Sequence, residues 1–380
     1  MKILINHLQE PANRVSGISK YLFSLLAALL QQDKHDYVLL TSWDTDKLPE
    51  VLQHPKLTVE SLPFEPSLPR NILRQLRLLP RYMKKHQAVL EFNCNPTGNF
   101  TGRWPKVSVV HDLYFNIAPA AYKFHHRLWW RWFFPLTCKA ASRIVCVSEN
   151  TRNDLQRFYP QYAHKTQVIT EGPCLPVPAQ VSSDPALRQS FGLFVANVSP
   201  NKGAGTLVRA MSILNQQGRA VQVRHVGSDP VGYFKQYMAA TEQGMAPVSE
   251  GYLSDEQLSR LYQQARFLAF PSQYEGFGLP VVEAQAHGTP VIASDIPVLR
   301  EVAGAGALFF PLNDAQAMAE QIHQLATDDQ LFQKMSEAAV ANQRRFSWQQ
   351  AAAETARLFE QLISDNAAEA AAFNYRRDES

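Results

Sequence analysis

The chain has 380 residues, of which 46% are hydrophobic and 19% are charged, so it is long enough for two globular domains and is not an intrinsically disordered protein. Its net charge of +3 conceals an asymmetry: residues 1–170 carry 22 Lys and Arg against 12 Asp and Glu, whereas residues 171–380 carry 15 against 22. No apolar run approaches the roughly 18 residues of a membrane-spanning helix, so we expect a cytoplasmic protein whose basic first half faces an anionic surface or substrate.

The first residues predict the opening of a doubly wound α/β domain. A strand at 2–6 precedes a loop, then Gly17 and a helix from about 21 to 30. The start M-K-I-L-I-N-H is too polar for a signal peptide, and the four scattered cysteines, with no C-x-x-C pair, favour a reducing compartment. Further short apolar runs predict strands at 37–40, 88–92, 107–110 and 143–147. We therefore expect a Rossmann-like first domain over residues 1–172.

A predicted helix over residues 70–85 carries basic side chains on one face. They recur at spacings of three and four, beside leucines, and comprise Arg70, Arg74, Arg77, Arg81, Lys84 and Lys85. Such a helix can lie in an anionic membrane interface, or it can be a core-packing helix with a solvated basic face. The sequence leaves both interpretations open.

A second basic segment, residues 122–134, is rich in aromatic side chains. Five large aromatics lie between Leu128 and Phe134, and Lys123, Arg127 and Arg131 are spaced by four. Contact with a membrane or a lipid-linked acceptor and a contact between packed helices are both open interpretations. We do not expect a nucleic-acid partner, because no DNA- or RNA-binding module frames the segment.

His111 directly follows the predicted strand at 107–110. Ligands of open α/β sheets bind at the carboxyl ends of the strands, so His111 and the neighbouring Asp112 are candidate site residues. A structural histidine could equally stand there. Residues 172–185 hold four prolines and are interpreted as the linker to a second domain at 173–345. In that domain Lys202 lies in a turn before a helix, where it can neutralise a diphosphate.

The strongest pattern runs from Phe270 to Glu283. A buried strand ends at Pro271, and two glycines then allow close approach of backbone N–H groups to a ligand, before a helix begins near Leu279. A glycine-bearing loop at a helix N-terminus is an anion site. Glu275 and Glu283 could hold two ends of one polar ligand, so the stretch predicts a phosphate-containing ligand with hydroxyl groups.

This stretch, E-G-F-G-L-P-V-V-E-A, resembles the nucleotide-sugar site of the retaining glycosyltransferases of family 4, whose signature is E-x7-E. The following G-T-P-V-I-A-S-D and Arg300-Glu301-Val302 fit the same family. The resemblance implies an α/β GT-B fold, in which two Rossmann-like domains face a central cleft and a closing helix, residues 346–380, crosses back to the first domain.

The resemblance also implies roles for individual residues. The loop at Gly17 approaches the donor diphosphate, and Lys202 and the backbone at Gly276–Leu279 stabilise it. Glu275 and His111 contact the sugar, and Glu283 binds the ribose hydroxyls. In the family, an arginine five residues before the lysine usually supplies a second cation for the diphosphate. This chain has Asn197 at that position, so the second cation is in doubt. The donor-binding set is Gly17, Asn197, Gly276, Phe277, Gly278, Leu279 and Glu283.

The family implies transfer of a hexose from a nucleotide diphosphate sugar to a glycan, and the sub-family resemblance favours mannose from GDP-mannose. A polysaccharide, lipopolysaccharide or polyprenyl-diphosphate-linked acceptor at the inner face of the membrane is expected, with the enzyme peripheral there. Asp44-Thr45-Asp46 is interpreted as a solvated loop and not a metal site, so no cofactor or divalent ion is expected to be required. A nucleotide-sugar epimerase and a non-catalytic scaffold are the alternatives.

Overall fold

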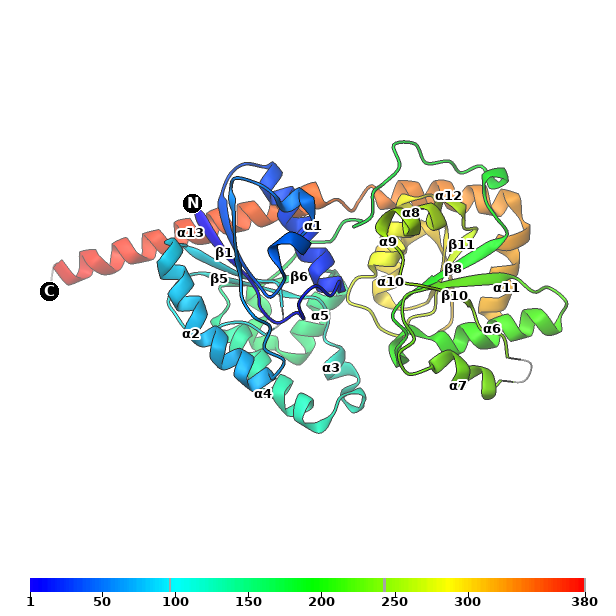
Figure 1. The fold of residues 1–380 in the computed structure, drawn as a ribbon, viewed down its shortest axis with the longest axis horizontal. Helices are drawn as coiled ribbons and strands as arrows, with labels where there is room; N and C mark the ends of the chain where they lie inside the picture. The colour runs from blue at the N-terminus through cyan, green and yellow to red at the C-terminus, as the bar shows by residue number, and fades with distance from the viewer. Residues whose placement is uncertain (96, 242–243, 379–380) are drawn as a thin grey trace. The chain divides into compact units, whose positions relative to one another are not determined.

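The computed structural model describes residues 1–95, 97–241 and 244–378 (Figure 1). The chain divides into two compact units. Unit 1 consists of Met1–Glu171 together with Trp348–Ser380, and unit 2 of Gly172–Ser347. In the described part of the chain, no helix is long and apolar enough to cross a membrane.

Unit 1 is built on a parallel sheet. Its described residues form seven strands in the order β3-β2-β1-β4-β5-β6-β7. The central strands are buried on both faces, which explains their continuous apolar sequence. The strands are β1 Lys2–His7, β2 Asp36–Thr41, β3 Leu57–Ser61, β4 Leu90–Asn93, β5 Lys106–Val110, β6 Arg143–Cys146 and β7 Thr166–Val168. Sequence analysis missed β3, a half-exposed strand at the edge of the sheet.

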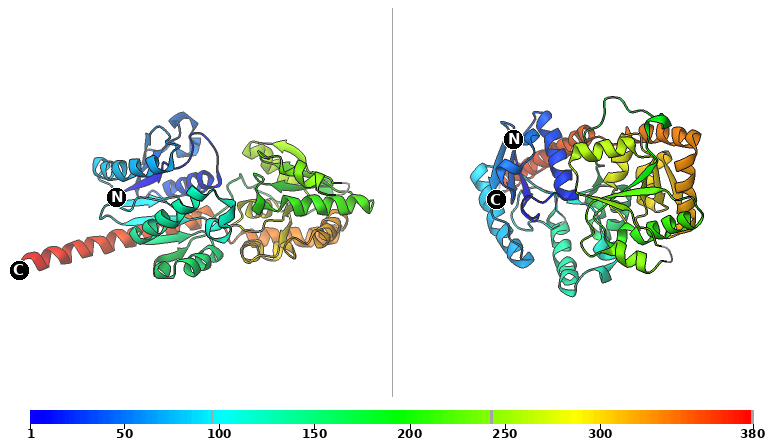
Figure 2. Two further views of the ribbon diagram at one scale, coloured as in Figure 1. Left: turned by 90° about the horizontal axis from the view of Figure 1, so that it is seen from below. Right: turned by 45° about the vertical axis from the view of Figure 1, so that its right-hand side comes forward.

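The helices of unit 1 cover this sheet and include the last helix of the chain. They are α1 Gly17–Gln31, α2 Leu68–His86, α3 Tyr114–Ile117, α4 Phe124–Ala140, α5 Glu149–Phe158 and α13 Trp348–Asp378. Ser16 caps α1 by accepting a hydrogen bond from the backbone of Ser19, whose side chain in turn accepts from the backbone of Ser16. Helix α13 packs against α1, so the closing helix returns to the first unit, as the resemblance implied (Figures 1 and 2).

Unit 2 has a smaller parallel sheet of the same kind. Six strands among its described residues take the order β10-β9-β8-β11-β12-β13. They are β8 Phe191–Val195, β9 Gln222–Val226, β10 Val248–Gly251, β11 Phe267–Phe270, β12 Val291–Ser294 and β13 Ala307–Phe310. Strands β10 and β13, which sequence analysis missed, are the two edge strands.

Helices lie on both faces of this second sheet (Figure 1). Helix α6 packs against α7 and α11, and α9 packs against α10 and α12. The helices are α6 Ala204–Gln216, α7 Tyr233–Ala239, α8 Asp255–Gln264, α9 Leu279–Ala286, α10 Pro297–Ala303, α11 Ala315–Thr327 and α12 Asp329–Gln343. In each unit the loops that carry the candidate residues follow the carboxyl ends of parallel strands, where such sheets bind their ligands.

Candidate active site

The loop between β11 and α9 carries the central part of the predicted site. Gly278 has φ +106°, a conformation that favours glycine, and it is the residue from which α9 departs. Pro280 lies in the first turn of the helix. In the described structure no side chain caps this end of α9, and Phe277 and Gly278 are buried against the unit. The loop therefore presents the positive end of a helix dipole, as an anion site requires.

Lys202 and Glu275 meet in unit 2. The Lys202 Nζ lies 2.8 Å from one carboxylate oxygen of Glu275 and 2.9 Å from the other. The side chains are 26% and 11% exposed, respectively, so the pair is only partly screened by solvent. The structure thus brings together two residues that are 73 positions apart and that sequence analysis placed in one site.

The turn that carries Lys202 is locked to the β11–α9 loop by its backbone. Gly203 has φ +67°, and a Cβ there would lie 1.9 Å from the carbonyl oxygen of Pro271. The backbone N–H of Gln273 donates to the carbonyl oxygen of Asn201 over 2.7 Å. Only glycine permits this close approach, which fixes the position of the neighbouring Lys202.

Glu283 lies on α9 and is 3% exposed. Its carboxylate interacts with the hydroxyl of Tyr262, and burial together with this carboxylate raises the pKa of Tyr262 well above its ordinary value. The Tyr262 hydroxyl therefore stays protonated at neutral pH. The predicted role of Glu283, binding ribose hydroxyls, remains a prediction.

Asn197, which stands in place of the family arginine, is engaged by neighbouring loops. Its Oδ1 accepts hydrogen bonds from the Ser228 backbone N–H at 3.1 Å, from the Ser228 hydroxyl at 2.9 Å and from the Tyr252 hydroxyl at 3.0 Å. The side chain thus ties together the loops after β8, β9 and β10. It carries no charge, so it can position these loops but cannot supply the missing cation.

His111 follows β5 and is held on several sides within unit 1. Its Nε2 lies 2.9 Å from the carbonyl oxygen of Cys94; because a carbonyl only accepts, Nε2 carries a proton. Its Nδ1 lies 3.6 Å from a carboxylate oxygen of Glu171, which is buried. The ring of Tyr21 packs edge-on at 4.8 Å. Glu171 and Tyr21 therefore fix the orientation of the imidazole, and sequence analysis had not identified them.

Gly17 occupies the first turn of α1 and is exposed. Among the described residues, no heavy atom lies within 4 Å of the position that a Cβ would take there. Packing within the unit therefore does not require glycine at this position, in contrast to Gly203. A ligand that approaches the backbone, as the resemblance implies, would require it.

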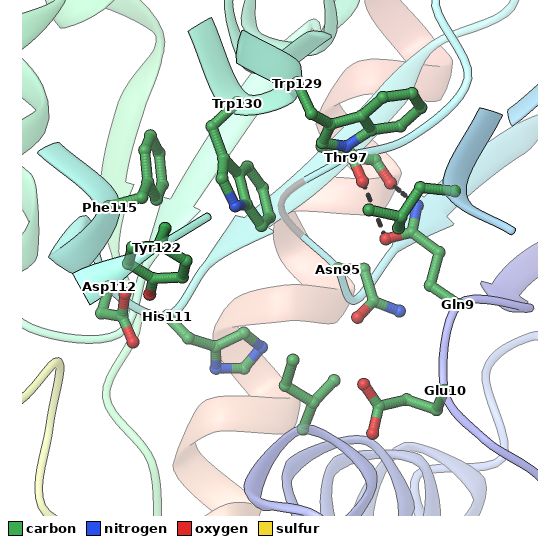
Figure 3. Close-up of a pocket in the computed structure, with 12 residues that line it drawn as sticks. Gln9, Glu10, Asn95, Thr97, His111, Asp112, Phe115, Tyr122, Trp129 and Trp130 are labelled. Atoms are coloured by element: carbon green, nitrogen blue, oxygen red, sulfur yellow. Dashed lines mark hydrogen bonds between the residues drawn. The ribbon is translucent and has the colours of Figure 1, made fainter. Parts of the chain in front are cut away.

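A cavity of about 280 Å³ opens beside His111 in unit 1 (Figure 3). It is lined by residues from the loops after β1, β4 and β5 and from α4. Sequence analysis identified His111 and Asp112 but missed the partners that long loops bring to them. These include Gln9, Glu10, Asn95 and Thr97. The one signal in the sequence that could have identified these four residues is that Gln9 and Glu10 follow one strand of the sheet and Asn95 and Thr97 follow another.

The described residues contain no group of three or more His, Cys, Asp or Glu side chains that could hold a metal ion. Asp44 accepts a hydrogen bond from the Asn13 side chain at 2.7 Å, and Thr45–Lys47 form a short exposed 3-10 helix. The D-x-D segment is thus an exposed surface turn. Whether the reaction requires a divalent ion stays a prediction.

Comparisons with known proteins extend over most of the chain. Residues 15–172 match the family described as Glycosyltransferase Family 4, and residues 181–342 match Glycosyl transferases group 1. O-antigen chain mannosyltransferase B of Escherichia coli is 29% identical over 238 residues, which cover 59% of this chain and 61% of that protein. A D-inositol 3-phosphate glycosyltransferase of Xylanimonas cellulosilytica is 30% identical over 236 residues, covering 56% and 55%. The chain thus spans little more than half the length of these relatives.

Solved structures of the same fold cover nearly the whole chain. Sucrose-phosphate synthase from Thermosynechococcus elongatus superposes with a TM-score of 0.75 at 21% identity, covering 96% of this chain and 99% of that one. WaaG, a glycosyltransferase involved in lipopolysaccharide biosynthesis, gives 0.72 at 16% identity, covering 94% and 99%. With both family matches, one on each unit, and with this shared architecture, the chain belongs to the family 4 (group 1) glycosyltransferases of GT-B fold.

Proposed function

We propose that the protein is a retaining hexosyltransferase that moves mannose from GDP-mannose to a glycan acceptor of the bacterial surface. The observation that carries the proposal is the Lys202–Glu275 pair at the glycine-bearing start of α9. A cation and a helix N-terminus together suit a leaving diphosphate. The mannosyltransferase names among the relatives support the choice of sugar.

The chemistry that we propose divides between these groups. Lys202 and the backbone N–H groups at Gly276–Leu279 stabilise the negative charge that develops on the diphosphate, which is the largest electrostatic contribution expected. Glu275, released from Lys202, orients the sugar and favours positive charge at its anomeric carbon. Glu283 accepts hydrogen bonds from the ribose hydroxyls, and His111 is the residue of unit 1 that we assign to the sugar.

No side chain is assigned as a dedicated base. The leaving phosphate takes the proton of the acceptor hydroxyl on the same face of the sugar, so the new bond retains the anomeric configuration. Because Lys202 and backbone N–H groups of the protein are assigned to the diphosphate, we propose that turnover requires no divalent ion. Activity measured with excess chelator tests this part of the proposal directly.

We also propose that unit 1 docks on an anionic membrane surface. Helix α4 exposes an apolar residue on every fourth position, with Phe124 76% and Trp132 63% exposed. The stripe consists of Phe124, Leu128, Trp132 and Leu136, and exposed basic residues flank it at Lys123, Arg127, Arg131 and Lys139. The sequence contains no acidic residue between Asp112 and Glu149. An apolar stripe with basic flanks suits the interface of an anionic bilayer.

Helix α4 also contributes to the core, because Trp129 and Phe134 are buried. The core-packing interpretation of the aromatic segment therefore holds for one face of the helix, and membrane contact is what we propose for the exposed face. Co-sedimentation with phosphatidylglycerol vesicles tests the exposed face. Trp132→Ser should reduce binding, whereas Leu187→Ser, which removes an exposed leucine of unit 2, should not. Equal binding to neutral phosphatidylcholine vesicles, or no effect of Trp132→Ser, would contradict the docking proposal.

The donor proposal is tested by thermal shift with GDP, UDP and ADP, each with excess chelator. A nucleotide at about a hundred times its dissociation constant should stabilise the protein by roughly 2.7 kcal/mol. A shift with GDP alone supports the proposed donor, and a shift with UDP or ADP keeps the enzyme class but overturns the donor. No shift with any nucleotide favours a non-catalytic scaffold. Release of an altered nucleotide sugar without an acceptor would instead identify an epimerase.

A further inference from the structure

The cavity beside His111 has a composition that indicates its ligand. It has an aromatic wall and a polar wall, whose residues Figure 3 shows, and the aliphatic side chains of Ile18 and Leu68 complete the lining. The aromatic wall comes mainly from the start of α4 and the segment before it. It comprises Phe115, Tyr122, Trp129 and Trp130, and the polar wall comprises Gln9, Glu10, Asn95, Thr97, His111 and Asp112.

The aromatic rings are held in place by their neighbours. Phe115 stacks on Trp130 with ring centroids 4.7 Å apart and an interplanar angle of 14°. Trp129 stacks on Phe133 at 4.0 Å. These contacts fix flat apolar surfaces before any ligand arrives, which lowers the entropic cost of binding. Burial with Asp112 nearby raises the pKa of Tyr122 to about 12, so its phenol stays protonated and can donate a hydrogen bond.

Asn95 has a carboxamide oxygen that makes no hydrogen bond with the described residues. The residue is 3% exposed, and its amide nitrogen contacts Cys94 Sγ at 3.7 Å, the one hydrogen bond that its side chain makes with the described residues. The oxygen can therefore accept a hydrogen bond from a ligand in the cavity. Hydroxyl groups of a ligand can both donate to the oxygen and accept from the nitrogen.

The charged side chains that line the cavity disfavour the binding of a phosphate group. Among the described residues that line the cavity, Glu10 and Asp112 are carboxylates and none is a lysine or arginine. His111 is the one lining group that can become cationic, and the buried carboxylate of Glu171 already lies 3.6 Å from it. The Glu10 carboxylate accepts a hydrogen bond from the Ser16 hydroxyl and so is oriented. A phosphate would meet like charge here without a compensating cation.

We infer that this cavity is the subsite for an uncharged sugar ring, the accepting end of the acceptor glycan. The ring stacks on the aromatic wall, and its hydroxyls bond to Asn95, Glu10 and Gln9. This inference rests on the proposed transferase function and specifies its acceptor. Phosphorylated acceptors, such as the inositol 3-phosphate named for one group of relatives, are disfavoured by the same lining.

The inference also places the reaction in a sequence of steps. If the accepting end is an uncharged sugar, the diphosphate of a lipid-linked acceptor lies at least one sugar away from the reacting hydroxyl. An earlier transfer must therefore have attached the first sugar to the lipid. The protein would then elongate a chain and not begin one.

The test uses the full chain with GDP-mannose and four acceptor probes. Methyl α-mannoside and a methyl mannobioside are neutral, whereas mannose 6-phosphate and inositol 3-phosphate are charged. Saturation-transfer NMR without donor measures binding, and GDP release measures transfer. We expect signals and turnover with the neutral probes and at least tenfold less of both with the charged ones.

Glu10→Gln keeps an acceptor for the Ser16 hydroxyl but removes the charge. It should raise KM for the methyl mannobioside about tenfold and leave the thermal shift by GDP unchanged. Asn95→Ala should do the same, and Glu50→Gln, an exposed glutamate that does not line the cavity, should change neither. An unchanged KM in Glu10→Gln and Asn95→Ala overturns the inference, as does preferred use of a phosphorylated probe. A normal GDP shift with no saturation transfer to either neutral probe also overturns it. Failure of the proposed function would be seen separately, because the unaltered protein would then show no thermal shift with any of the three nucleotides.

Discussion

The candidate donor loops of unit 2 and the cavity of unit 1 are built in different ways. In unit 2, two short segments, 199–203 and 271–283, supply the site, and backbone contacts hold them together. In unit 1, side chains from loops and helices between residues 9 and 130 line the cavity, and side-chain hydrogen bonds and ring stacking hold them. The first arrangement depends on glycines and on one ion pair, and the second on a set of individually replaceable side chains.

This difference in construction indicates which properties substitutions in each unit should change. A diphosphate presents the same anionic group whatever the sugar, so a site made of backbone N–H groups and one lysine can serve many donors. An acceptor is recognised by its own hydroxyl pattern, which the side chains of the proposed subsite can distinguish. We therefore expect changes in unit 2 to alter turnover or folding, and changes in unit 1 to alter acceptor choice.

Lys202→Ala should have the largest effect. It removes the cation that we assign to the leaving diphosphate, so kcat should fall about 10³-fold, or about 4 kcal/mol. Steady-state kinetics with GDP-mannose and thermal unfolding together separate a lost catalytic group from a lost fold. Near-normal turnover would remove Lys202 from the site.

The ion pair complicates this variant, because it leaves Glu275 unpaired and only 11% exposed. Glu275→Gln and the double variant complete a double-mutant cycle. If Lys202 acts only by pairing with Glu275, the double variant should be as active as Glu275→Gln alone. If Lys202 stabilises the diphosphate, the double variant should be far less active than Glu275→Gln.

The same difference decides what sequence alone could predict. Apolar runs and glycines are local signals, so the α/β fold was predicted from them, and the family resemblance placed Lys202 and Glu275 in one site without predicting the ion pair that joins them. Edge strands such as β3 were missed because half-exposed strands lack a continuous apolar run. The cavity could not be predicted, since Gln9, Asn95 and Trp130 meet only through the order of the parallel strands.

Asn197 shows a further limit of sequence comparison. Its position in the motif suggested a donor-binding residue that lacks the expected charge. The structure gives its oxygen three hydrogen bonds, from the Ser228 backbone and hydroxyl and the Tyr252 hydroxyl. Asn197 therefore has a structural task that the motif does not describe, and its part in donor binding stays a prediction.

Gly203→Ala should test the backbone lock of unit 2. The substitution places a Cβ in the left-handed region and 1.9 Å from the carbonyl oxygen of Pro271, so we expect a loss of about 3 kcal/mol in the free energy of unfolding. Gly218→Ala is the matched control: its φ is +70°, and no described atom lies within 4 Å of its Cβ position. It should cost only about 1 kcal/mol. Equal losses in urea unfolding would show that the contact with Pro271 does not hold the loop.

His7 should make unit 1 sensitive to acid. Burial lowers the pKa of His7 from 6.5 to about 4, so the unfolded chain binds a proton between these values that the folded chain does not. The resulting loss of unfolding free energy is absent above pH 6.5 and grows as the pH falls toward 4, reaching about 2 kcal/mol at pH 5. His7→Leu should flatten the fall in unfolding free energy between pH 7 and pH 5 by this amount. An unchanged slope would mean that the other buried histidines or carboxylates dominate.

Gly17→Ala should give the smallest effect and the sharpest distinction between the two kinds of construction. Nothing described lies within 4 Å of the new methyl group, and alanine favours helix more than glycine does, so the free energy of unfolding should rise by about 0.5 kcal/mol. If donor diphosphate approaches this backbone, the methyl group should nevertheless weaken GDP binding, by roughly fivefold or about 1 kcal/mol. Calorimetric titration with GDP and urea unfolding measure the two quantities independently. Higher stability with weaker binding would assign Gly17 to the ligand, whereas higher stability with unchanged binding would make it only the first residue of α1, and the donor site would then have no backbone contribution from this loop.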